Sequence, residues 1–277
     1  MTVTAPTSLA DALAALADEP ASLVLAGGTD LMVQVNEGLR RPGPGPVLAL
    51  AGVSELRAVE RQGDELVVGA GVTYTELMAQ PTASLAPALA QAARTVGSPQ
   101  IRNAGTIGGN LGTASPAGDT LPVLVALGAT VEVASTATRR ALPISEFLTG
   151  PKATALEPGE LIVAVRVPVA RGPQEYLKVG VRNAMVIAVA SVAMVVDRDA
   201  GTVGVGLGSV GPTALAAPDA CTWLIEQSDW TDDAIAGEFA DRVAHAARPI
   251  DDHRGRASYR RHAVGVMARR ALRRCAA

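Results

Sequence analysis

The order of apolar segments along the chain changes once, near Arg171. Before this point, short apolar runs such as Leu23–Leu25 alternate with segments whose apolar residues recur at helical spacing. After it, three valine-rich segments come first and three helical segments follow. Strands that alternate with helices are typical of α/β units, whereas consecutive strands followed by helices favour an antiparallel sheet packed against helices. The order therefore predicts an α+β protein with a distinct C-terminal domain.

Helix start signals and apolar periodicity place the individual elements. Ser8 with Asp11, and Thr73 with Glu76, have the spacing of capping boxes that open helices. We expect strands at Leu23–Leu25, Val47–Leu50, Glu65–Gly69, Thr130–Ala134, Leu161–Val167, Tyr176–Val181, Val186–Asp197 and Thr202–Val210. Further helices are expected at about Asp30–Val35, Ala86–Val96, Asp119–Leu127, Pro218–Glu226, Thr231–Ala246 and Ala257–Arg274. Arg40–Pro46 and Gly105–Gly118 are expected as loops because they are rich in glycine, the first also in proline.

The composition excludes several classes of protein. Of the 277 residues, 48% are apolar and 18% charged, which is typical of a globular chain rather than a disordered one. A net charge of −3 and only 3% aromatic residues argue against a nucleic-acid partner. The N-terminus lacks the basic and long apolar regions of a signal peptide, and the longest apolar run, Met185–Val196, is shorter than the roughly 20 residues of a membrane span. We therefore expect a soluble, cytoplasmic protein.

The cysteines and histidines do not have the spacing of a metal site. Cys221 and Cys275 are too few for an iron–sulfur cluster, and a reduced pair is favoured over a disulfide. His245, His253 and His262 lack an HExxH pattern, so no bound metal is expected.

An apolar run ends at two adjacent glycines in LVLAGGTDLM, residues 23–32. Paired glycines allow positive φ angles and let backbone N–H groups approach a ligand without an intervening Cβ. Successive N–H groups in such a turn can bind an anion, and a helix that starts there adds further free N–H groups. Taken alone, the turn is equally compatible with a simple chain reversal.

A second glycine-rich segment, QIRNAGTIGGNLGTASPAGDTLP, spans residues 100–122. It combines several glycines with the hydroxyl groups of Thr106, Thr113 and Ser115, and Asp119 follows at the expected start of the next helix. A long loop of this composition is more often functional than structural. Neither segment reads GxGxxG or GxxxxGK[ST], so a Rossmann dinucleotide site and a P-loop are disfavoured. A pyrophosphate could instead lie between the two segments, where Arg102 would be the only nearby cation.

Together the two segments resemble the FAD-binding subunit of molybdenum hydroxylases, a family that includes xanthine and carbon monoxide dehydrogenases. The resemblance rests on AGGTDL at residues 26–31 and on QIRNAGTIGGNL and ASPAGD at residues 100–119. It extends to APTSLADALAAL near the N-terminus, LVVGAGVTYTEL at residues 66–77 and ELIVAVRVP at residues 160–168. YLKVGVRNAMVIAVASVA at residues 176–193, which is most similar to the xanthine dehydrogenase branch, and the tail RASYRRHAVGVMARRAL at residues 256–272 also fit. The similarity therefore covers nearly the whole chain.

The resemblance implies a fold and a set of cofactor contacts. The fold would be a vanillyl-alcohol-oxidase-like FAD-binding domain of two α/β subdomains, residues 1–54 and 55–171, followed by a C-terminal domain, residues 172–277, with a three-stranded antiparallel sheet and helices. The implied FAD contacts are Leu25, Ala26, Gly27, Gly28, Thr29, Asp30, Leu31, Gly105, Thr106, Gly108, Gly109, Asn110, Ser115, Asp119, Ile162 and Lys178. Asp119 would bind the sugar portion of the cofactor, and Lys178 would lie near the flavin. Val186 departs from the pattern, because many members have an aspartate in the corresponding AMDIA motif.

The resemblance also implies an electron-transfer function with no acid–base catalytic residue in this chain. A molybdopterin-binding large subunit would hydroxylate the substrate, and a [2Fe–2S] small subunit would deliver electrons to FAD. NAD⁺ or another acceptor would then be reduced. Two alternatives remain: a free-standing flavin oxidase of the same fold, and a non-catalytic FAD- or nucleotide-binding module. The absence of any histidine before residue 245 argues against an oxidase with a histidine-linked flavin.

The last 24 residues contain eight arginines. A solvated helix face and an interface with a partner subunit explain this concentration equally well. Trp223, Trp230 and Phe239 lie at positions assigned to or bordering the C-terminal helices and are expected in the core.

Overall fold

The computed structural model describes residues 2–38 and 45–276, and its N-terminal part is a small parallel sheet. The order is β1 (Val3–Thr4), β3 (Val47–Ala49) and β2 (Leu23–Leu25), with α1 (Leu9–Asp18) and α2 (Leu31–Asn36) before and after β2. Ser8 caps α1 by accepting a hydrogen bond from the Asp11 N–H, while the Asp11 carboxylate accepts from the Ser8 hydroxyl rather than from a backbone N–H. The loop expected at Arg40–Pro46 lies mostly outside the described residues.

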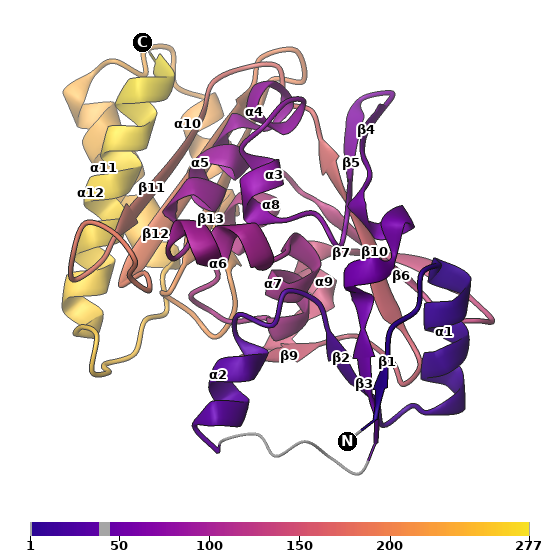
Figure 1. The fold of residues 1–277 in the computed structure, drawn as a ribbon. Coiled ribbons are helices and arrows are strands. Elements are labelled where there is room, and N and C mark those ends of the chain that lie inside the picture. Colours follow the sequence, from indigo (N-terminus) through magenta and orange to yellow (C-terminus); the bar gives the residue numbers. More distant parts are fainter. Residues whose placement is uncertain (1, 39–44, 277) are drawn as a thin grey trace.

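A second sheet of five antiparallel strands forms the centre of the molecule (Figure 1). Its order is β4 (Val59–Gln62), β5 (Glu65–Gly69), β10 (Leu161–Pro168), β6 (Thr130–Ala134) and β7 (Arg139–Pro143). Two 3₁₀ helices, Leu50–Gly52 and Ser54–Arg57, lead into this sheet. The helices between β5 and β6 are α3 (Tyr74–Leu77), α4 (Thr82–Leu85), α5 (Pro87–Thr95), α6 (Pro99–Ala104), α7 (Ile107–Thr113) and α8 (Leu121–Ala126). Helix α9 (Ile144–Phe147) and the hairpin of β8 (Leu148–Gly150) and β9 (Ala153–Thr154) precede β10.

The expectation of an unbroken loop at Gly105–Gly118 was wrong, because α7 occupies residues 107–113. Glycine has low intrinsic helix propensity, but tertiary packing overrides that preference here. Ile107 and Leu111, four residues apart, are both fully buried and give α7 an apolar face. The Thr106 side chain caps the helix by accepting a hydrogen bond from the Gly109 N–H. The Thr73–Glu76 capping box at the start of α3 is confirmed.

The C-terminal part is an antiparallel sheet between two layers of helices (Figure 1). The three expected strands are β11 (Gln174–Val179), β12 (Ala190–Asp197) and β13 (Thr202–Gly208), and the two-residue β14 (Leu215–Ala216) adds a fourth. β12 begins at Ala190 rather than Val186, because residues 180–189 form a loop. Helices α5 and α8 pack on one face, and α10 (Pro218–Ile225), α11 (Asp233–Ala246) and α12 (Ala257–Ala276) complete the domain.

Two hydrophobic clusters stabilise these layers. The larger cluster runs from α1 to the central sheet and reaches Tyr176 and Ala193 of the C-terminal sheet. The smaller one lies between that sheet and α10–α12 and contains Phe239, whereas Trp223 and Trp230 are only partly buried at its edge. The α+β fold with a C-terminal antiparallel sheet is therefore confirmed. The divisions after residues 54 and 171 stay predictions, since the larger cluster crosses both positions.

The arginine-rich segment contributes several internal contacts. Arg260 is 4% exposed and donates to the carbonyl oxygens of Val189 (3.0 Å) and Ser209 (2.6 Å). Arg269 and Arg273 pair with Asp233. These arginines therefore attach α12 to the C-terminal sheet and to α11, whatever the other arginines of the segment contact.

Candidate functional site

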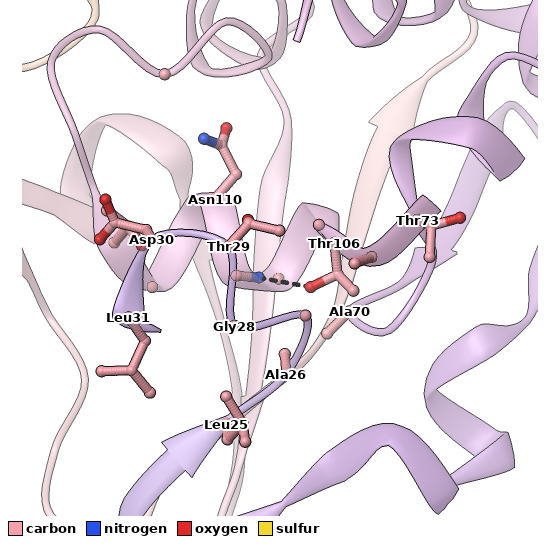
Figure 2. Close-up of a pocket in the computed structure, with 18 of the residues that line it drawn as sticks. Leu25, Ala26, Gly28, Thr29, Asp30, Leu31, Ala70, Thr73, Thr106 and Asn110 are labelled. Atoms are coloured by element: carbon pink, nitrogen blue, oxygen red, sulfur yellow. Dashed lines mark hydrogen bonds between the residues drawn. The ribbon is translucent and has the colours of Figure 1, made fainter. Parts of the chain in front are cut away.

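A cavity of about 1010 Å³ opens where the β2–α2 turn meets α7. Its wall also includes the start of β10 and the loop after β11. Of the sixteen residues predicted to contact a cofactor, fifteen line this cavity: Leu25, Ala26, Gly27, Gly28, Thr29, Asp30, Leu31, Gly105, Thr106, Gly108, Gly109, Asn110, Ser115, Asp119 and Ile162. Lys178 lies behind the wall, where it pairs with Asp119. Figure 2 shows members of both glycine-rich segments around the same space.

The β2–α2 turn presents a series of unpaired backbone donors. Among the described residues, no acceptor receives a hydrogen bond from the N–H groups of residues 27–31. Gly28 has φ +70°, a conformation that an L-residue adopts only at a cost. The turn also follows the carboxyl end of a parallel strand, which is where α/β sheets bind ligands. These donors can bind an anionic group without any basic side chain.

The two glycine-rich segments touch through their backbones. A Cβ atom on Gly27 would lie only 1.8 Å from the Ala104 carbonyl oxygen, so no larger residue fits in this conformation. The Gly108 position is also close-packed, though less tightly, since a Cβ there would lie 2.6 Å from the Ala70 oxygen. Gly109 differs, because its closest contact would be the Thr106 hydroxyl at 3.1 Å and its open side faces the cavity.

The first three N–H groups of α7 are paired within the protein and are not free to bind a ligand. The Ile107 N–H donates to Val72 O (3.0 Å), and the Gly108 N–H donates to Ala70 O (2.8 Å). The Gly109 N–H donates to Thr106 Oγ1 at 3.0 Å, the bond drawn in Figure 2. These amides instead fix α7 against the central sheet. Helix α7 therefore offers the cavity close main-chain packing and side chains rather than free amides at residues 107–109.

Asn110 is the main polar side chain that α7 directs to the cavity. Its Oδ1 accepts a hydrogen bond from the Thr120 hydroxyl at 2.5 Å, which orients the amide group. Within the described chain, its NH₂ group donates to no other residue, and Figure 2 shows the amide next to the turn that carries Thr29 and Asp30. Asn110 can therefore donate a hydrogen bond to a ligand.

Asp119 connects the cavity to the C-terminal sheet. Its carboxylate accepts hydrogen bonds from the Tyr176 hydroxyl (2.8 Å) and from Lys178 Nζ (2.7 Å), both on β11. Lys178 Nζ also donates to Thr95 O at 3.2 Å, and the Lys178 and Asp119 side chains are 7% and 9% exposed. Burial raises the pKa of Asp119, and the charge of Lys178 opposes that rise. Lys178 therefore acts on the cavity through Asp119.

Sequence reasoning missed several charged or polar groups of the cavity wall. Tyr74 is buried there, and burial together with the Asp119 charge raises its pKa well above the usual range. Arg57 lines the wall and pairs with Glu76. Glu160 is held by Arg140, and Lys152 lies in the turn between β8 and β9. The one sequence signal that could have pointed to Lys152 was the scarcity of lysine, since the chain has two lysines and 22 arginines.

Arg102, the cation noted in the second segment, is not directed at the cavity. Its guanidinium donates to the carbonyl oxygens of Val96 (3.1 Å) and Gly97 (3.0 Å), so it closes the turn before α6.

The loop after β11 gives the cavity an apolar edge. Met185, Val186 and Ile187 line it, and Met185 and Ile187 remain more than half exposed. Met185 has φ +50°, and its carbonyl oxygen accepts from Arg182 Nε at 3.1 Å. Val186, which replaces the aspartate of the AMDIA motif, is therefore part of the cavity wall.

Within residues 2–38 and 45–276, no three His, Cys, Asp or Glu side chains are grouped as a metal site. No helix in those same ranges has the length and hydropathy to cross a bilayer. Cys221 and Cys275 are both free and buried.

The chain matches two protein families that together cover nearly all of it. Residues 1–170 match the FAD binding domain in molybdopterin dehydrogenase, and residues 175–275 match the CO dehydrogenase flavoprotein C-terminal domain. Among curated proteins, the glyceraldehyde dehydrogenase medium chain of Sulfolobus acidocaldarius is 31% identical, over 96% of this chain and 95% of the relative. The carbon monoxide dehydrogenase medium chain of Hydrogenophaga pseudoflava is 32% identical, over 97% and 94%.

Two further comparisons concern the branch and the fold. A putative xanthine dehydrogenase FAD-binding subunit of Escherichia coli K12 is 36% identical, over 58% of this chain and 55% of the relative. The crystal structure of the Cu,Mo-CO dehydrogenase superposes with a TM-score of 0.92 at 30% identity, covering 99% of this chain and 97% of that one. The similarity therefore includes both the carbon monoxide and the xanthine dehydrogenases.

Proposed function

Because this chain belongs to the family of FAD-binding subunits of molybdopterin dehydrogenases, we propose that it is the electron-transfer subunit of a molybdenum hydroxylase complex. It would receive electrons from a [2Fe–2S] small subunit and pass them to an external acceptor, for which NAD⁺ is one candidate. A large subunit that carries molybdopterin would oxidise the organic substrate. The xanthine dehydrogenase branch remains our specific proposal for the type of complex.

One observation supports this proposal most directly. The unpaired amides of residues 27–31 lie on the wall of a cavity that the second glycine-rich segment closes through main-chain contact. Its volume of about 1010 Å³ is at the upper end of the range for small-molecule sites, as a dinucleotide requires. Amides in this arrangement suit a diphosphate, and the hydroxyl and amide side chains nearby suit ribose and ribityl groups. The residues present therefore fit FAD.

FAD would supply the redox chemistry, and the chain would bind and orient it. We assign the diphosphate to the amides of residues 27–31 and a hydrogen bond from the cofactor's polar groups to Asn110. Asp119, held in place by Tyr176 and Lys178, would accept from a cofactor hydroxyl. Met185, Val186 and Ile187 would limit the access of water to one end of the cavity.

The first experiment tests the cofactor and the partners together. The full chain is expressed with its neighbouring genes and purified through a tag on this chain. We expect flavin absorbance near 450 nm, a general property of FAD, together with stoichiometric molybdenum and iron. A flavin-free chain that does not take up added FAD would refute the cofactor assignment, and a flavin-loaded chain without molybdenum or iron would refute the complex. Comparison of NAD⁺, oxygen and a quinone as oxidants of the reduced complex then identifies the acceptor.

The second experiment tests the cavity. Gly109 is the glycine whose open side faces the cavity, so Gly109→Leu should place a side chain in the ligand's space while leaving the packing of α7 intact. We expect loss of FAD uptake with an unchanged circular dichroism spectrum. Gly237→Ala is the matched control, since nothing lies within 4 Å of a Cβ at that helical position. Equal FAD affinity for wild type and Gly109→Leu would contradict the assignment.

A further inference from the structure

Both lysines of the chain lie at the cofactor cavity, although arginine is eleven times more frequent. Lys178 is buried against Asp119, behind the wall. Lys152 lines the wall directly and is solvent-exposed. A lysine ammonium is a compact charge on a flexible stem, which suits a single phosphate contact.

The charges of the cavity wall leave Lys152 as the available cation. The wall contains three carboxylates and two cations: Asp30, Asp119, Glu160, Arg57 and Lys152. Arg57 is paired with Glu76, Glu160 with Arg140, and Asp119 with Lys178. Within the described part of the chain, Lys152 makes no salt bridge and no side-chain hydrogen bond. An entering anion would therefore meet a wall with a negative formal charge and one unpaired cation.

The backbone at Lys152 is held in an unfavourable conformation that keeps it at the cavity. Its φ of +56° lies in the left-handed region, which a non-glycine residue occupies at a cost. The Lys152 N–H donates to Ala114 O at 3.0 Å, so the β8–β9 turn is fastened to the C-terminal end of α7. The same helix forms the wall next to the unpaired amides of the β2–α2 turn. A tertiary contact therefore fixes the base of the lysine side chain on the cavity wall, at the end of α7 opposite to the one that the β2–α2 turn meets.

We propose that Lys152 binds the diphosphate of FAD and supplies, among the described residues of the wall, the one positively charged side chain that is not already paired. The inference rests on the proposed function, because the anion it assigns is part of FAD. It adds a residue that the glycine-rich segments do not contain and a reason for the distortion of the β8–β9 turn.

The test measures FAD affinity of the full flavin-free chain by quenching of flavin fluorescence. Lys152→Gln should weaken FAD binding roughly tenfold at low salt, the size expected for loss of one charge-assisted contact. Lys152→Arg should retain most of the affinity. Arg139→Gln removes an exposed positive charge on β7 that does not line the cavity, and it should bind like the wild type. Added salt should weaken the wild type more than Lys152→Gln, since an ionic contact is screened.

Competing ligands identify the part of the cofactor that Lys152 contacts. ADP should compete with FAD better than adenosine does in the wild type, and Lys152→Gln should reduce that advantage. If Lys152→Gln weakens ADP and adenosine equally, or leaves FAD affinity unchanged, the inference is wrong. In both cases the wild type still binds FAD, so the proposed function survives. Failure of the wild type to bind FAD would instead refute the function.

Chemical labelling gives a second readout. Lys178 is buried, so acetic anhydride should modify mainly Lys152 among the lysines. Saturating FAD should slow acetylation of Lys152 several-fold, measured by mass spectrometry of the peptide. An unchanged rate with FAD bound would overturn the assignment.

Discussion

Glu160 is the most completely satisfied carboxylate of the cavity wall. It accepts from Arg140 Nε (2.7 Å) and Nη2 (2.8 Å) and from the Glu157 N–H (2.8 Å). Its side chain is 4% exposed. The hydrogen bonds from Arg140, more than any other contact, hold the pKa of Glu160 below its usual value.

The Arg140–Glu160 pair predicts a pH-dependent stability difference. Glu160→Gln should lower the free energy of unfolding at pH 7 by about 1.5–3 kcal/mol, because a charged acceptor is lost. A depressed folded-state pKa stabilises the protein above the unfolded pKa of about 4.5, and that gain is lost as pH falls through the lower folded value. Urea unfolding between pH 7 and 3 should therefore show the gap between wild type and variant shrinking below about pH 4.5.

Glu146→Gln is the control for this measurement, since Glu146 is exposed on α9 and should change stability by less than about 0.5 kcal/mol. A gap that stays constant down to pH 3 would contradict the assigned role of Glu160.

Individual residues were predictable where the backbone itself is unusual. Gly27 and Gly28 mark a turn that only glycine can form, and the sequence pointed to both. The sequence did not point to Lys152, and it could not show that Lys178 pairs with Asp119, because these positions depend on contacts with Ala114 and Asp119 that are distant in sequence. The cofactor contact of Lys178 stays a prediction. The acceptors of the Ile107 and Gly108 amides, Val72 and Ala70, lie in the turn after β5, so residue type alone could not show that these amides are occupied.

At the scale of the element, α7 shows how adjacent glycines can have different roles. Gly108 packs against Ala70, whereas Gly109 faces the cavity. Periodicity failed for this segment because the apolar face has only Ile107 and Leu111, spaced between glycines that usually end helices. Longer elements with repeated apolar residues, such as α11 and β10, were predicted within a few residues of their bounds.

The two glycines predict opposite effects of the same substitution. Gly108→Ala should lower stability by about 1–3 kcal/mol even without FAD, because the methyl group would displace α7 from the sheet. Gly109→Ala should leave the stability of the flavin-free chain nearly unchanged. Thermal unfolding of both variants without cofactor measures the difference, and equal melting temperatures would show that α7 does not pack as described.

The contact between α8 and β13 joins the central and C-terminal parts of the molecule. A Cβ on Gly206 would lie 1.8 Å from the Pro122 carbonyl oxygen, so the helix backbone rests directly on the strand. Gly206→Ala should therefore destabilise the protein by at least about 2 kcal/mol, since neither main chain can yield easily. Gly237→Ala, in an open helical position, should be neutral or slightly stabilising. Calorimetry of both variants tests the prediction, and a stable Gly206→Ala protein would contradict it.

At the scale of the whole molecule, the hydrophobic core continuous across residues 54 and 171 predicts cooperative unfolding. The reactivity of the two buried cysteines reports on this unfolding. Burial raises the pKa of Cys221 to about 11 and, together with the charge of Glu175, that of Cys275 to about 12. Neither thiol should react with a thiol reagent at pH 8 under native conditions.

Both thiols should become reactive together, in one transition, as denaturant is added. The reaction of a cysteine-containing peptide with the same reagent gives the unhindered rate. Labelling of either cysteine at that rate in native buffer, or exposure of both thiols before the circular dichroism signal of the whole chain is lost, would show that the C-terminal part opens independently.

The backbone contact between Gly27 and Ala104 has a consequence for how this site can change over time. Here the spacing between the two glycine-rich segments is set by peptide groups, and these groups stay in place when side chains other than those at the glycines are substituted. The side chains around this part of the cavity can therefore be substituted during evolution without altering its shape, provided that the hydrophobic core beneath it stays well packed. Near-identical architecture at 30% identity, with a TM-score of 0.92, is what such tolerance would produce.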